Sequence, residues 1–572
     1  MTASPRTTPR LTKTLGIVAL WMVMACAEAP PEPQAAADRP NVLLIIVDDL
    51  GFNDLSIFGS EIETPNLDAL ARDGVMLTNF HVSPTCSPTR AMLLAGTDSH
   101  IAGLGTMAGD AAPNQEGRPG YEGYMNHRVA ALPALFQDAG YNTYMTGKWH
   151  LGLAEDTNPA ARGFDKSFVL LQGGAGHFAN MLPLVGPDLA KYTEDGEPVN
   201  ALPEDFYSTR FFTERMIEYI DGGRASGNPF FAYLSYTAPH WPLQAPQESI
   251  AKYHGKYDAG YDALREQRLQ RLKDLGMVAA EAEPFPKMLG EKAWDELSAE
   301  EQRYQAKLME IYAAMVDDID VYVGQIIDHL KSIGAYENTL IFFTSDNGPE
   351  AHHLDVGWPQ LEAWVEVCCD NSYENLGKAD SYVWYGPNWG QAGTIPLRMY
   401  KGFTSQGGVR VPAFFHFPKA IRRNASTADL TTVKDVMPTL LEFADIDHPG
   451  DGTFRGRAVA PMEGRSMTPL LTGASETIRQ PDDYMGWALF GKRAIRQGDW
   501  KIIYLPSHET RDGVIPPMVT TDAWQLYNLA DDPAEMHDLS ETHPEKLAAM
   551  IALWDDYVEN NNVIVPDSLI AY

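Results

Sequence analysis

The chain is poor in cysteine and in basic residues. Among 572 residues there are only four cysteines, and 44 Lys and Arg stand against 77 Asp and Glu, which gives a formal net charge of -33. Four cysteines exclude a disulfide framework, and no Cys/His spacing typical of zinc is present. Cys368 and Cys369 are predicted to be structural thiols, with a vicinal disulfide as the alternative. The acidic balance disfavours nucleic acid as a partner, because a phosphate backbone needs a basic surface.

Long apolar runs are also scarce, although a hydrophobic content of 44% is enough for a buried core. Residues 15–24 form an apolar run behind a basic start, too short to span a bilayer and typical of an export signal. We predict an export signal over 1–26 and a flexible Pro/Ala-rich tether over 27–39. Val23 to Cys26 resembles a lipoprotein box, which predicts a lipid anchor at Cys26; ordinary cleavage near Ala27 or Ala29 is the alternative. The mature chain is expected in the periplasm, held at the outer membrane if Cys26 is lipidated.

Several predicted strands run directly into polar, reactive residues. The apolar run 41–47 ends at Asp48 and Asp49, and the run 339–345 ends at Asp346 and Asn347. Two more strands, 141–146 and 230–236, precede a Lys-Trp-His segment and an Ala-Pro-His segment that supply Lys148, His150 and His240. Helices are predicted over 128–139 and 307–333. Ligands gather outside the carboxyl ends of parallel strands, so these side chains are expected at one edge of a sheet.

Strands that alternate with helices predict an α/β domain, with a large, mostly parallel sheet between helices, over residues 40–454. From about Arg455 onward the pattern changes. Four short strand-like runs, 484–490, 492–497, 499–505 and 523–529, are followed by helical spacing over 543–559. This predicts a smaller C-terminal α+β domain of antiparallel sheet and one helix over 455–572.

The most informative stretch is Cys86-Ser87-Pro88-Thr89-Arg90. Ser87 and Pro88 predict a helix start, with Ser at the cap and Pro at the first position, so residue 86 would lie at the positive end of a helix dipole. A lone cysteine before a Ser-Pro turn is more often an ordinary core thiol. The motif gains weight from the other strand-end clusters and from the segment 401–412, which begins at Lys401.

Together these motifs resemble the type I sulfatases of the alkaline phosphatase superfamily, most closely the bacterial arylsulfatases of the Pseudomonas type. The resemblance runs from about Asn41 to Tyr557. It implies that a maturation enzyme oxidises Cys86 to formylglycine (3-oxoalanine), whose hydrate is the nucleophile. Thr89 and Ala95 depart from the commonest family pattern, and Gln406 stands where many relatives carry Glu.

The resemblance also implies the metal site. Asp48, Asp49, Asp346 and Asn347 match the family's ligands, and the converted residue 86 adds an oxygen. Hard oxygen ligands select Ca²⁺ or Mg²⁺ over zinc, and we expect Ca²⁺ rather than Mg²⁺. The adjacent pair His352 and His353 is predicted to belong to a hydrated loop, outside this site.

The remaining roles follow from the same resemblance. Arg90 would stabilise the nucleophile, and Lys148 would bind a sulfate oxygen. His150 would take the proton whose loss expels sulfate, and His240 would protonate the leaving group and contact the substrate. Lys401 would hold the bridging oxygen or another sulfate oxygen.

The expected reaction is hydrolysis of a sulfate monoester to an alcohol or phenol and sulfate, with a small sulfate ester or a sulfated glycan as substrate. The nearest alternative is a phosphonate monoester or phosphodiester hydrolase of the same superfamily, because phosphoryl and sulfuryl groups share shape and in-line geometry. A third hypothesis is a surface lipoprotein that binds sulfated glycans without turnover, and it predicts an unmodified Cys86.

Overall fold

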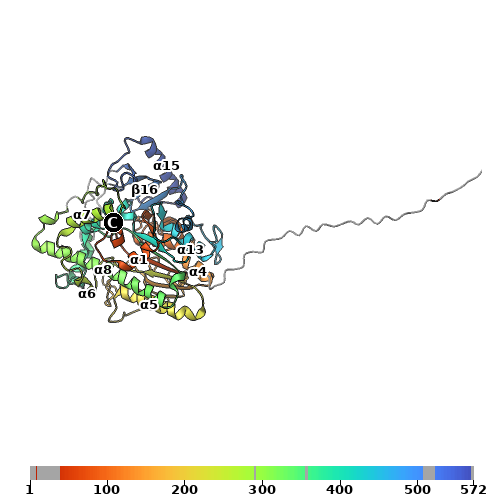
Figure 1. Cartoon of the computed structure of the whole chain (residues 1–572), viewed down its shortest axis with the longest axis horizontal. Helices are drawn as coiled ribbons and strands as arrows, with labels where there is room; N and C mark the ends of the chain where they lie inside the picture. The colour runs from red at the N-terminus through yellow and green to blue at the C-terminus, as the bar shows by residue number, and fades with distance from the viewer. Residues whose placement is uncertain (1–7, 9–38, 289–290, 355–358, 507–521, 569–572) are drawn as a thin grey trace, which may run out of the picture. The chain divides into compact units, whose positions relative to one another are not determined.

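Strand β1 (Asn41–Val47) is buried on both sides and defines the core of the fold. Its odd-numbered apolar side chains, such as Ile45, pack into one hydrophobic cluster, and the even-numbered ones, such as Ile46, pack into a second. Side chains alternate across a strand, so a continuous apolar run requires a covering layer on each face. The computed structural model, which describes residue 8 and residues 39–288, 291–354, 359–506 and 522–568, has this three-layer arrangement (Figure 1).

The central sheet has ten strands in the order β11-β2-β10-β9-β1-β8-β4-β5-β6-β7. The four central strands β9 (Thr339–Ser345), β1, β8 (Phe230–Ser235) and β4 (Asn142–Lys148) are parallel to one another. Antiparallel pairs occur towards both edges, for example β10 with β9 and β5 with β6. The sheet is therefore mixed with a parallel centre, and the carboxyl ends of β9, β1, β8 and β4 meet at one edge, as predicted.

The outer strands of this sheet are short. They are β11 (Ala425–Thr427), β2 (Val75–Leu77), β10 (Ala413–His416), β5 (Lys166–Leu170), β6 (Tyr192–Glu194) and β7 (Glu197–Val199). The two-residue strands β3 (Phe80–His81) and β12 (Thr431–Thr432) form a separate parallel pair, and β13 (Thr453–Phe454) and β14 (Arg457–Ala458) an antiparallel one.

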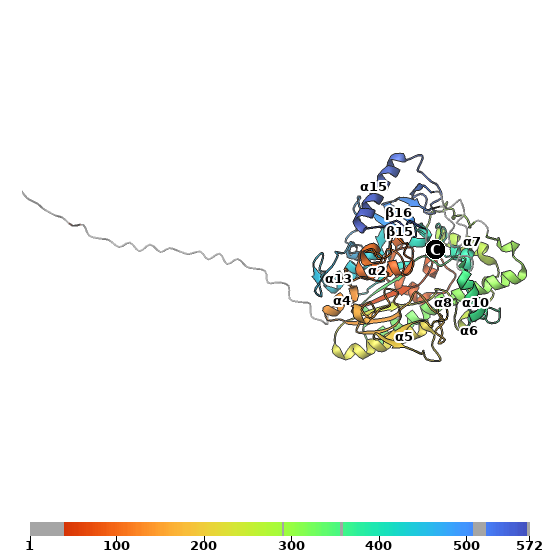
Figure 2. The ribbon, with the colours of Figure 1, turned by 180° about the vertical axis from the view of Figure 1, so that it is seen from behind.

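Helices cover both faces of the sheet. One face packs against α1 (Pro65–Arg72), α5 (Ser208–Gly223) and α8 (Ala299–Ser332), and the other against α2 (Cys86–Ala95), α4 (Leu132–Asp138) and α13 (Val436–Ala444). Helix α1 is drawn towards the viewer in Figure 1 and α2 in Figure 2. The remaining helices are α3 (Ser99–Ala102), α6 (Gln247–Ala251), α7 (Gly260–Asp274), α10 (Pro359–Cys368), α11 (Gly386–Ala392), α12 (Gln406–Val409) and α14 (Thr468–Thr472).

The C-terminal part is a four-stranded antiparallel sheet in the order β15-β16-β17-β18, with helix α15 (Pro544–Asn561) against one face. Its strands are β15 (Met485–Leu489), β16 (Lys492–Gln497), β17 (Trp500–Tyr504) and β18 (Trp524–Asn528), which confirms the predicted runs. The other face packs on the segment that carries Lys401, through Tyr400 and Phe403. The boundary near residue 455 stays a prediction.

Two predicted helices differ from the observed ones. The helix expected over 128–139 is only α4, because Pro133 disfavours helical backbone in the residues before it. The helix expected over 307–333 begins earlier, as α8, where Ser298 caps the helix and Glu301 completes a capping box that the prediction missed.

The two vicinal cysteines also correct the sequence prediction. Cys368 and Cys369 form a disulfide at the end of α10, so they are not the free structural thiols that we expected. Sequence spacing gave no reason to prefer the disulfide.

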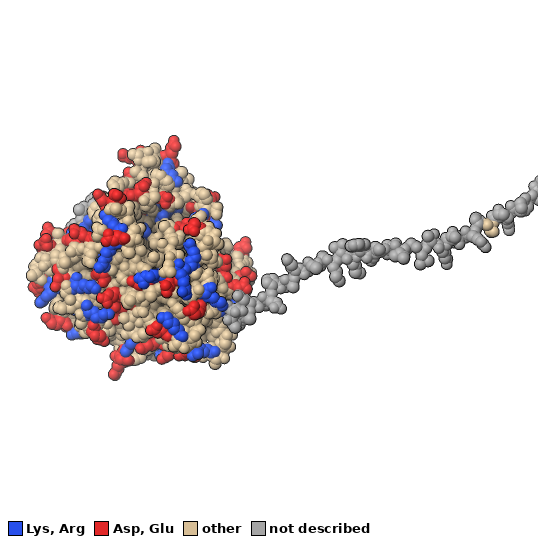
Figure 3. Space-filling view, in the orientation of Figure 1, with Lys and Arg blue, Asp and Glu red and all other residues tan. Residues whose placement is uncertain are grey.

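The predicted export signal, Cys26 and the predicted tether up to residue 38 lie outside the described residues. Among the described helices, none combines the length and the apolar character that a bilayer span requires. On the face drawn in Figure 3, acidic and basic side chains are interspersed.

Candidate active site

Cys86 opens helix α2 and is 2% exposed. Thr85 is the N-cap, two residues before the predicted cap Ser87, and Pro88 occupies the third helical position instead of the first. The predicted start of the helix is therefore corrected. Pro88 is tolerated at this position because an N–H in the first turn of a helix has no partner within the helix, so its absence in proline costs nothing. The expected consequence holds, because residue 86 lies in the first turn, at the positive end of the helix dipole.

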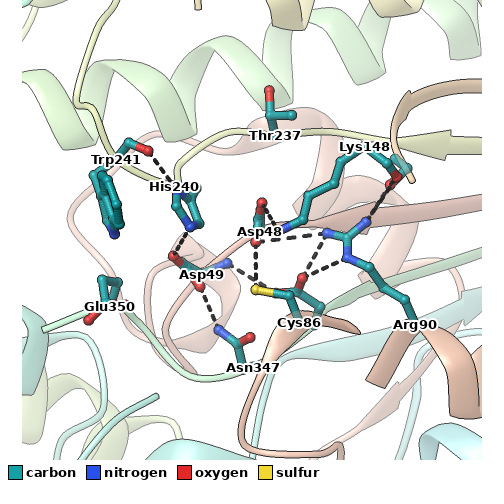
Figure 4. A network of polar contacts seen from close by, with 12 residues as sticks. Asp48, Asp49, Cys86, Arg90, Lys148, Thr237, His240, Trp241, Asn347 and Glu350 are labelled. Atoms are coloured by element: carbon teal, nitrogen blue, oxygen red, sulfur yellow. Dashed lines mark hydrogen bonds and ion pairs between the residues drawn. The ribbon is translucent and has the colours of Figure 1, made fainter. Parts of the chain in front are cut away.

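Four acidic or thiol side chains converge on this position. Ligand atoms of Asp48, Asp49, Cys86 and Asp346 all lie within 4.8 Å of one another. Cys86 Sγ is 3.4 Å from Asp48 Oδ1, and the backbone N–H of Asp49 donates to Asp346 Oδ1 at 3.2 Å. Two strand ends separated by almost 300 residues in sequence thus form one buried cluster, as Figure 4 shows for Asp48, Asp49 and Cys86.

The residues of this cluster fit a divalent cation. Asn347 Nδ2 donates to Asp49 Oδ1 at 2.6 Å, whereas its Oδ1 is buried and has no hydrogen-bond partner among the described residues. Burial raises the pKa of Asp49 to about 8, although Lys401 opposes it, and neighbouring carboxylates raise it further. Buried like charges favour protonation unless a cation neutralises them. The donor set is carboxylate and amide oxygen, which suits Ca²⁺ or Mg²⁺.

Arg90 ties helix α2 to the carboxylate cluster. Its Nη2 lies 2.7 Å from Asp346 Oδ2, and its Nη1 donates to the hydroxyl of Ser235 at 2.5 Å and to the carbonyl of Lys148 at 3.3 Å. The neighbouring carboxylates raise the pKa of this fully buried guanidinium despite burial. Ser235 ends strand β8, and the prediction missed it, because a serine at a strand end carries no distinctive signal.

Lys148 and Lys401 approach the cluster from different segments. Lys148 Nζ is 2.7 Å from Asp48 Oδ2, and Lys401 Nζ is 2.8 Å from Asp49 Oδ1. Both side chains are almost completely buried. Neither is a solvated surface charge, which is the ordinary state of a lysine.

Glu350 is a member of this network that the sequence prediction missed. Its Oε2 lies 3.3 Å from Lys401 Nζ, and its Oε1 accepts from the backbone N–H and from the ring Nδ1 of His352. The only available signal was its place four residues after Asp346. His352 is 5% exposed, so the prediction of a hydrated loop is wrong for this residue. His353 pairs with Glu291 instead.

His150 follows the end of β4. The strand stops at Lys148, and His150 has a φ of 55°, so the fully extended segment that we expected does not continue to this residue. Burial, followed by the charges of Lys148 and Arg90, lowers its pKa well below the usual range. Its buried Nδ1 has no hydrogen-bond partner among the described residues. A neutral imidazole with a free nitrogen is suited to accept a proton.

His240 lies on the opposite side of Asp49 from Asn347 (Figure 4). Its Nδ1 donates to the carbonyl of Trp241 at 2.5 Å, and its Nε2 lies 3.5 Å from Asp49 Oδ2. Burial, then Lys401 and Lys148, lower the pKa of this histidine. Because a carbonyl can only accept, Nδ1 carries the proton and Nε2 is the nitrogen available to a substrate.

All ten predicted site residues therefore gather at one edge of the sheet, around Cys86 and a cluster of oxygen atoms that fits a divalent cation. The sulfatase family model matches residues 40–446, and the chain belongs to this family. It is a sulfuric ester hydrolase. A second family model, the C-terminal part of N-sulphoglucosamine sulphohydrolase, matches residues 399–559.

Proteins from several organisms are similar to this chain in sequence. The chain is 45% identical over 553 residues to an uncharacterized sulfatase of Schizosaccharomyces pombe, covering 94% of this chain and 97% of the relative. It is 40% identical over 439 residues to the arylsulfatase of Klebsiella aerogenes, covering 76% and 93% respectively. Arylsulfatase J of Mus musculus is 26% identical over 548 residues, covering 90% of this chain and 75% of that protein.

Solved structures share the fold. The structure of Ps i-CgsB in complex with k-i-k-neocarrahexaose superposes with a TM-score of 0.64 at 23% identity, covering 93% of this chain and 95% of that one. A structure in complex with its substrate D-glucosamine-2-N,6-O-disulfate gives a TM-score of 0.60 at 20% identity, covering 93% and 99%. These likenesses establish the α/β architecture of the large domain.

Proposed function

We propose that the protein hydrolyses sulfate monoesters with a formylglycine derived from Cys86 as the nucleophile and Ca²⁺ as the bound metal. The observation that carries the proposal is the position of Cys86, at the first turn of α2 and within 4.8 Å of three carboxylates. Burial raises the pKa of the unmodified thiol well above its usual range, so a thiolate nucleophile is disfavoured there. A hydrated aldehyde supplies two hydroxyl groups on one carbon, one to attack sulfur and one to expel sulfate by C–O cleavage when its proton is lost.

The metal would be held by Asp48, Asp49, Asp346 and Asn347, and it would supply charge neutralisation for the attacking oxygen and the sulfate. Four buried carboxylates, those of Asp48, Asp49, Asp346 and Glu350, face three cations, those of Arg90, Lys148 and Lys401. When all four carboxylates are ionised, the set has one excess negative charge. A divalent cation reverses that sign, which favours a monoanionic sulfate ester. Ca²⁺ is proposed over Mg²⁺ because the donors come from separate segments, without evident octahedral constraint.

The chain's own side chains would orient the ester. Lys148 and Lys401 are fixed by Asp48 and Asp49, so their ammonium groups are preorganised to donate to sulfate oxygens without further ordering. Arg90 holds Asp346 and the first turn of α2 in register. His150 would accept the proton that is lost when sulfate departs. His240 would give a proton from Nε2 to the leaving oxygen, and the bound sulfate favours its protonated form.

The surroundings of His240 support an ester with an apolar organic group. The Trp241 ring lies 4.9 Å from the His240 ring and 5.8 Å from Tyr382, and Trp364 lies 5.2 Å from Tyr382. Leu184 faces His240 across Gly174, where an added Cβ would meet both side chains at 3.1–3.2 Å. We infer that an aryl group packs against this wall, as aromatic faces prefer offset or edge contacts. Sulfated glycans are the competing substrate class, because a structure with the same fold was solved with its substrate D-glucosamine-2-N,6-O-disulfate.

We also propose export to the periplasm, with an outer-membrane lipid anchor at Cys26 and conversion of Cys86 by a separate maturation enzyme. The signal-like composition of residues 1–26 supports export. Replacement of Cys26 by Ala and recovery of the protein from the soluble periplasmic fraction would support the anchor. Retention of that variant in the outer membrane would oppose it.

Two measurements test the proposed function. The peptide that contains residue 86 should show the mass of formylglycine in protein from its native host; an intact thiol in active enzyme would overturn the proposed nucleophile. The value of kcat/KM should be higher for 4-nitrophenyl sulfate than for the matched phosphonate and phosphodiester. A clear preference for the phosphoryl esters would instead support the alternative hydrolase. No turnover of any ester, together with an intact thiol, would support a glycan-binding protein.

A further inference from the structure

Apart from the candidate active site, the structure has a cavity where the C-terminal sheet meets the large domain, with a volume of about 870 Å³. We call it the second cavity. None of the ten predicted site residues lines it. Its walls include the segment around Thr78 and Asn79, and the side chains of Gln406, Arg410 and Arg496. Most of its acidic lining, such as Glu281, Glu283 and Asp499, consists of exposed residues, whereas Arg496 is 3% exposed.

Within the described part of the chain, Arg496 on strand β16 forms hydrogen bonds only with uncharged groups. Its Nε donates to the carbonyl of Gly498 at 2.9 Å, and its Nη1 lies 3.1 Å from Asn79 Oδ1 and from His81 Nε2. The other guanidinium nitrogen, Nη2, has no hydrogen-bond partner among the described residues. A buried guanidinium ordinarily has a carboxylate or phosphate partner.

Arg410 reaches the same segment from the end of α12. Its Nε and Nη2 both donate to the carbonyl of Thr78, at 2.9 and 2.6 Å, and its guanidinium lies 4.5 Å from the centre of the Phe52 ring. Its Nη1 likewise lacks a partner among the described residues. Neither Arg410 nor Arg496 forms an ion pair with a described carboxylate. Two rigid guanidiniums, each with a free N–H edge, therefore border one cavity.

The electrostatics of the two arginines agree with this geometry. Burial lowers the pKa of Arg496 to about 10, although the charges of Asp499 and Glu535 oppose the shift. Burial, followed by the charge of Arg496, lowers the pKa of Arg410 to about 10. Nearby Lys501 is buried as well and pairs with Glu535 at 2.8 Å. Two carboxylates act against the three cations, the buried Glu535 and the exposed Asp499 of the cavity wall, so one positive charge is in excess. This excess is costly in a low-dielectric interior unless an anion offsets it.

We propose that this cavity binds a tetrahedral oxyanion, sulfate or phosphate, either free or as the head group of a small organic ester, between Arg410 and Arg496. Each arginine has one guanidinium nitrogen left to donate, Nη2 of Arg496 and Nη1 of Arg410, and two such charged donors from separate segments can hold different oxygens of one oxyanion. The oxyanion would join the segment 78–81 to strand β16. The cavity is larger than an oxyanion, so it has room for the organic part of an ester. The acidic rim disfavours polyanions, so a single anionic group is expected.

Selenate, the heavier analogue of sulfate, provides a direct test on the wild-type protein. Crystals soaked in selenate should give an anomalous peak between Arg410 and Arg496, in addition to any peak at the catalytic centre. A peak at the catalytic centre alone would overturn the proposal. This measurement depends on no variant, so a folding defect cannot obscure it.

Calorimetric titration tests the site in solution. The wild-type protein should bind sulfate or phosphate at one more site per chain than Arg496→Met, and Arg410→Met should weaken that site about 10-fold or more, as expected for one charge-assisted hydrogen bond. The control is Arg493→Met, since Arg493 lies on the same strand three residues away and does not line the cavity. Equal stoichiometry in wild type and Arg496→Met would overturn the proposal.

The same titration separates the two sources of the oxyanion. A hexyl sulfonate, which the enzyme cannot hydrolyse, represents an ester head group, whereas inorganic sulfate and phosphate represent the free ions. Tighter binding of the sulfonate at the Arg496-dependent site would indicate an organic ester. Tighter binding of the inorganic ions would indicate a free oxyanion.

Discussion

The catalytic centre and the second cavity both bury arginine or lysine side chains, but they compensate the charges in opposite ways. At the centre each cation contacts a carboxylate: Arg90 with Asp346, Lys148 with Asp48, and Lys401 with Asp49. At the second cavity, Arg410 and Arg496 rest on carbonyl, amide and imidazole groups. Counting buried side chains only, the first region has more carboxylates than cations, and the second has more cations than carboxylates.

The difference shows which ligand each region lacks. Buried charge is tolerated only when it is paired, so a surplus of one sign indicates a ligand of the other sign. The centre's surplus fits a divalent cation, and the cavity's surplus fits an anion. The sign of the surplus carries more information than the residue types, because both regions use the same basic side chains.

Replacement of Cys86 tests the centre most severely. Cys86→Ala should lower kcat/KM for 4-nitrophenyl sulfate by at least about 10⁴-fold, because it removes the only proposed nucleophile. Ala is a good helix former, so the circular dichroism spectrum should be unchanged. The matched control is Ser87→Ala, the next residue of the same helical turn, which should keep activity within about 3-fold. Full activity in Cys86→Ala would exclude the proposed chemistry.

Removal of the metal tests the surplus of negative charge. Chelation should lower activity by about 10²–10³-fold or more, the loss typical of one preorganised electrostatic group. Added Ca²⁺ should restore activity and raise the melting temperature, because a ligand that binds only the folded state stabilises it. Mg²⁺ should restore less. An enzyme that is fully active when metal analysis finds no divalent cation would contradict the charge argument.

The two histidines should differ in their dependence on the leaving group. His240→Ala should cost about 10²–10⁴-fold with an alkyl sulfate, whose leaving oxygen needs a proton, and much less with 4-nitrophenyl sulfate. His150→Ala serves as the contrast, since release of sulfate from the enzyme does not involve the organic group. Its loss should be similar for both esters. Equal losses for His240→Ala with both esters would remove the proton-donor role from His240.

Glu350 tests whether Lys401 needs both of its carboxylates. Glu350→Gln should lower kcat/KM about 10-fold, the lower range for a residue that orients a ligand-binding group. Glu350→Asp should recover part of the loss. Glu291→Gln is the control, because Glu291 pairs with the neighbouring His353 and has no contact with Lys401. A loss equal in both variants would point to general destabilisation.

The sequence predicted which residues gather at the candidate active site because most of them lie at strand ends. Asp48 and Asp346 each follow an apolar run, and parallel strands bring their carboxyl ends to one edge wherever the runs pair. Glu350 and Ser235 were missed because their roles depend on side-chain contacts across distant segments. The hydrophobic pattern of the sequence does not show which side chains contact one another in the folded protein.

The second cavity could not be predicted from the sequence for a related reason. Arg410 belongs to the motif that begins at Lys401, and Arg496 belongs to a predicted strand, but nothing local shows that both contact residues 78–79. The same holds for Cys368 and Cys369, whose disulfide depends on backbone conformation rather than on spacing. Charge compensation is a property of tertiary structure and becomes visible only there.

The pH dependence of stability measures the positive surplus near the second cavity. Burial lowers the pKa of Lys501 from 10.5 to about 8, although Glu535 opposes the shift. Below about pH 8 Lys501 is protonated in both states, and the folded protein carries the full cost of the buried charge. Between about pH 8 and 10.5 the unfolded chain binds more protons than the folded one, so Lys501 makes the free energy of unfolding rise with pH.

The slope attributable to Lys501 should reach at most ~1.4 kcal/mol per pH unit. The reference is the double variant Lys501→Met with Glu535→Gln, which removes the pair without leaving a buried charge unpaired and keeps the many tyrosines that also titrate in this range. Urea denaturation of both proteins from pH 7 to 10 should show wild type gaining stability relative to the variant above pH 8. A difference that is independent of pH would mean that Lys501 bears no penalty, because a carboxylate or bound anion already offsets its charge.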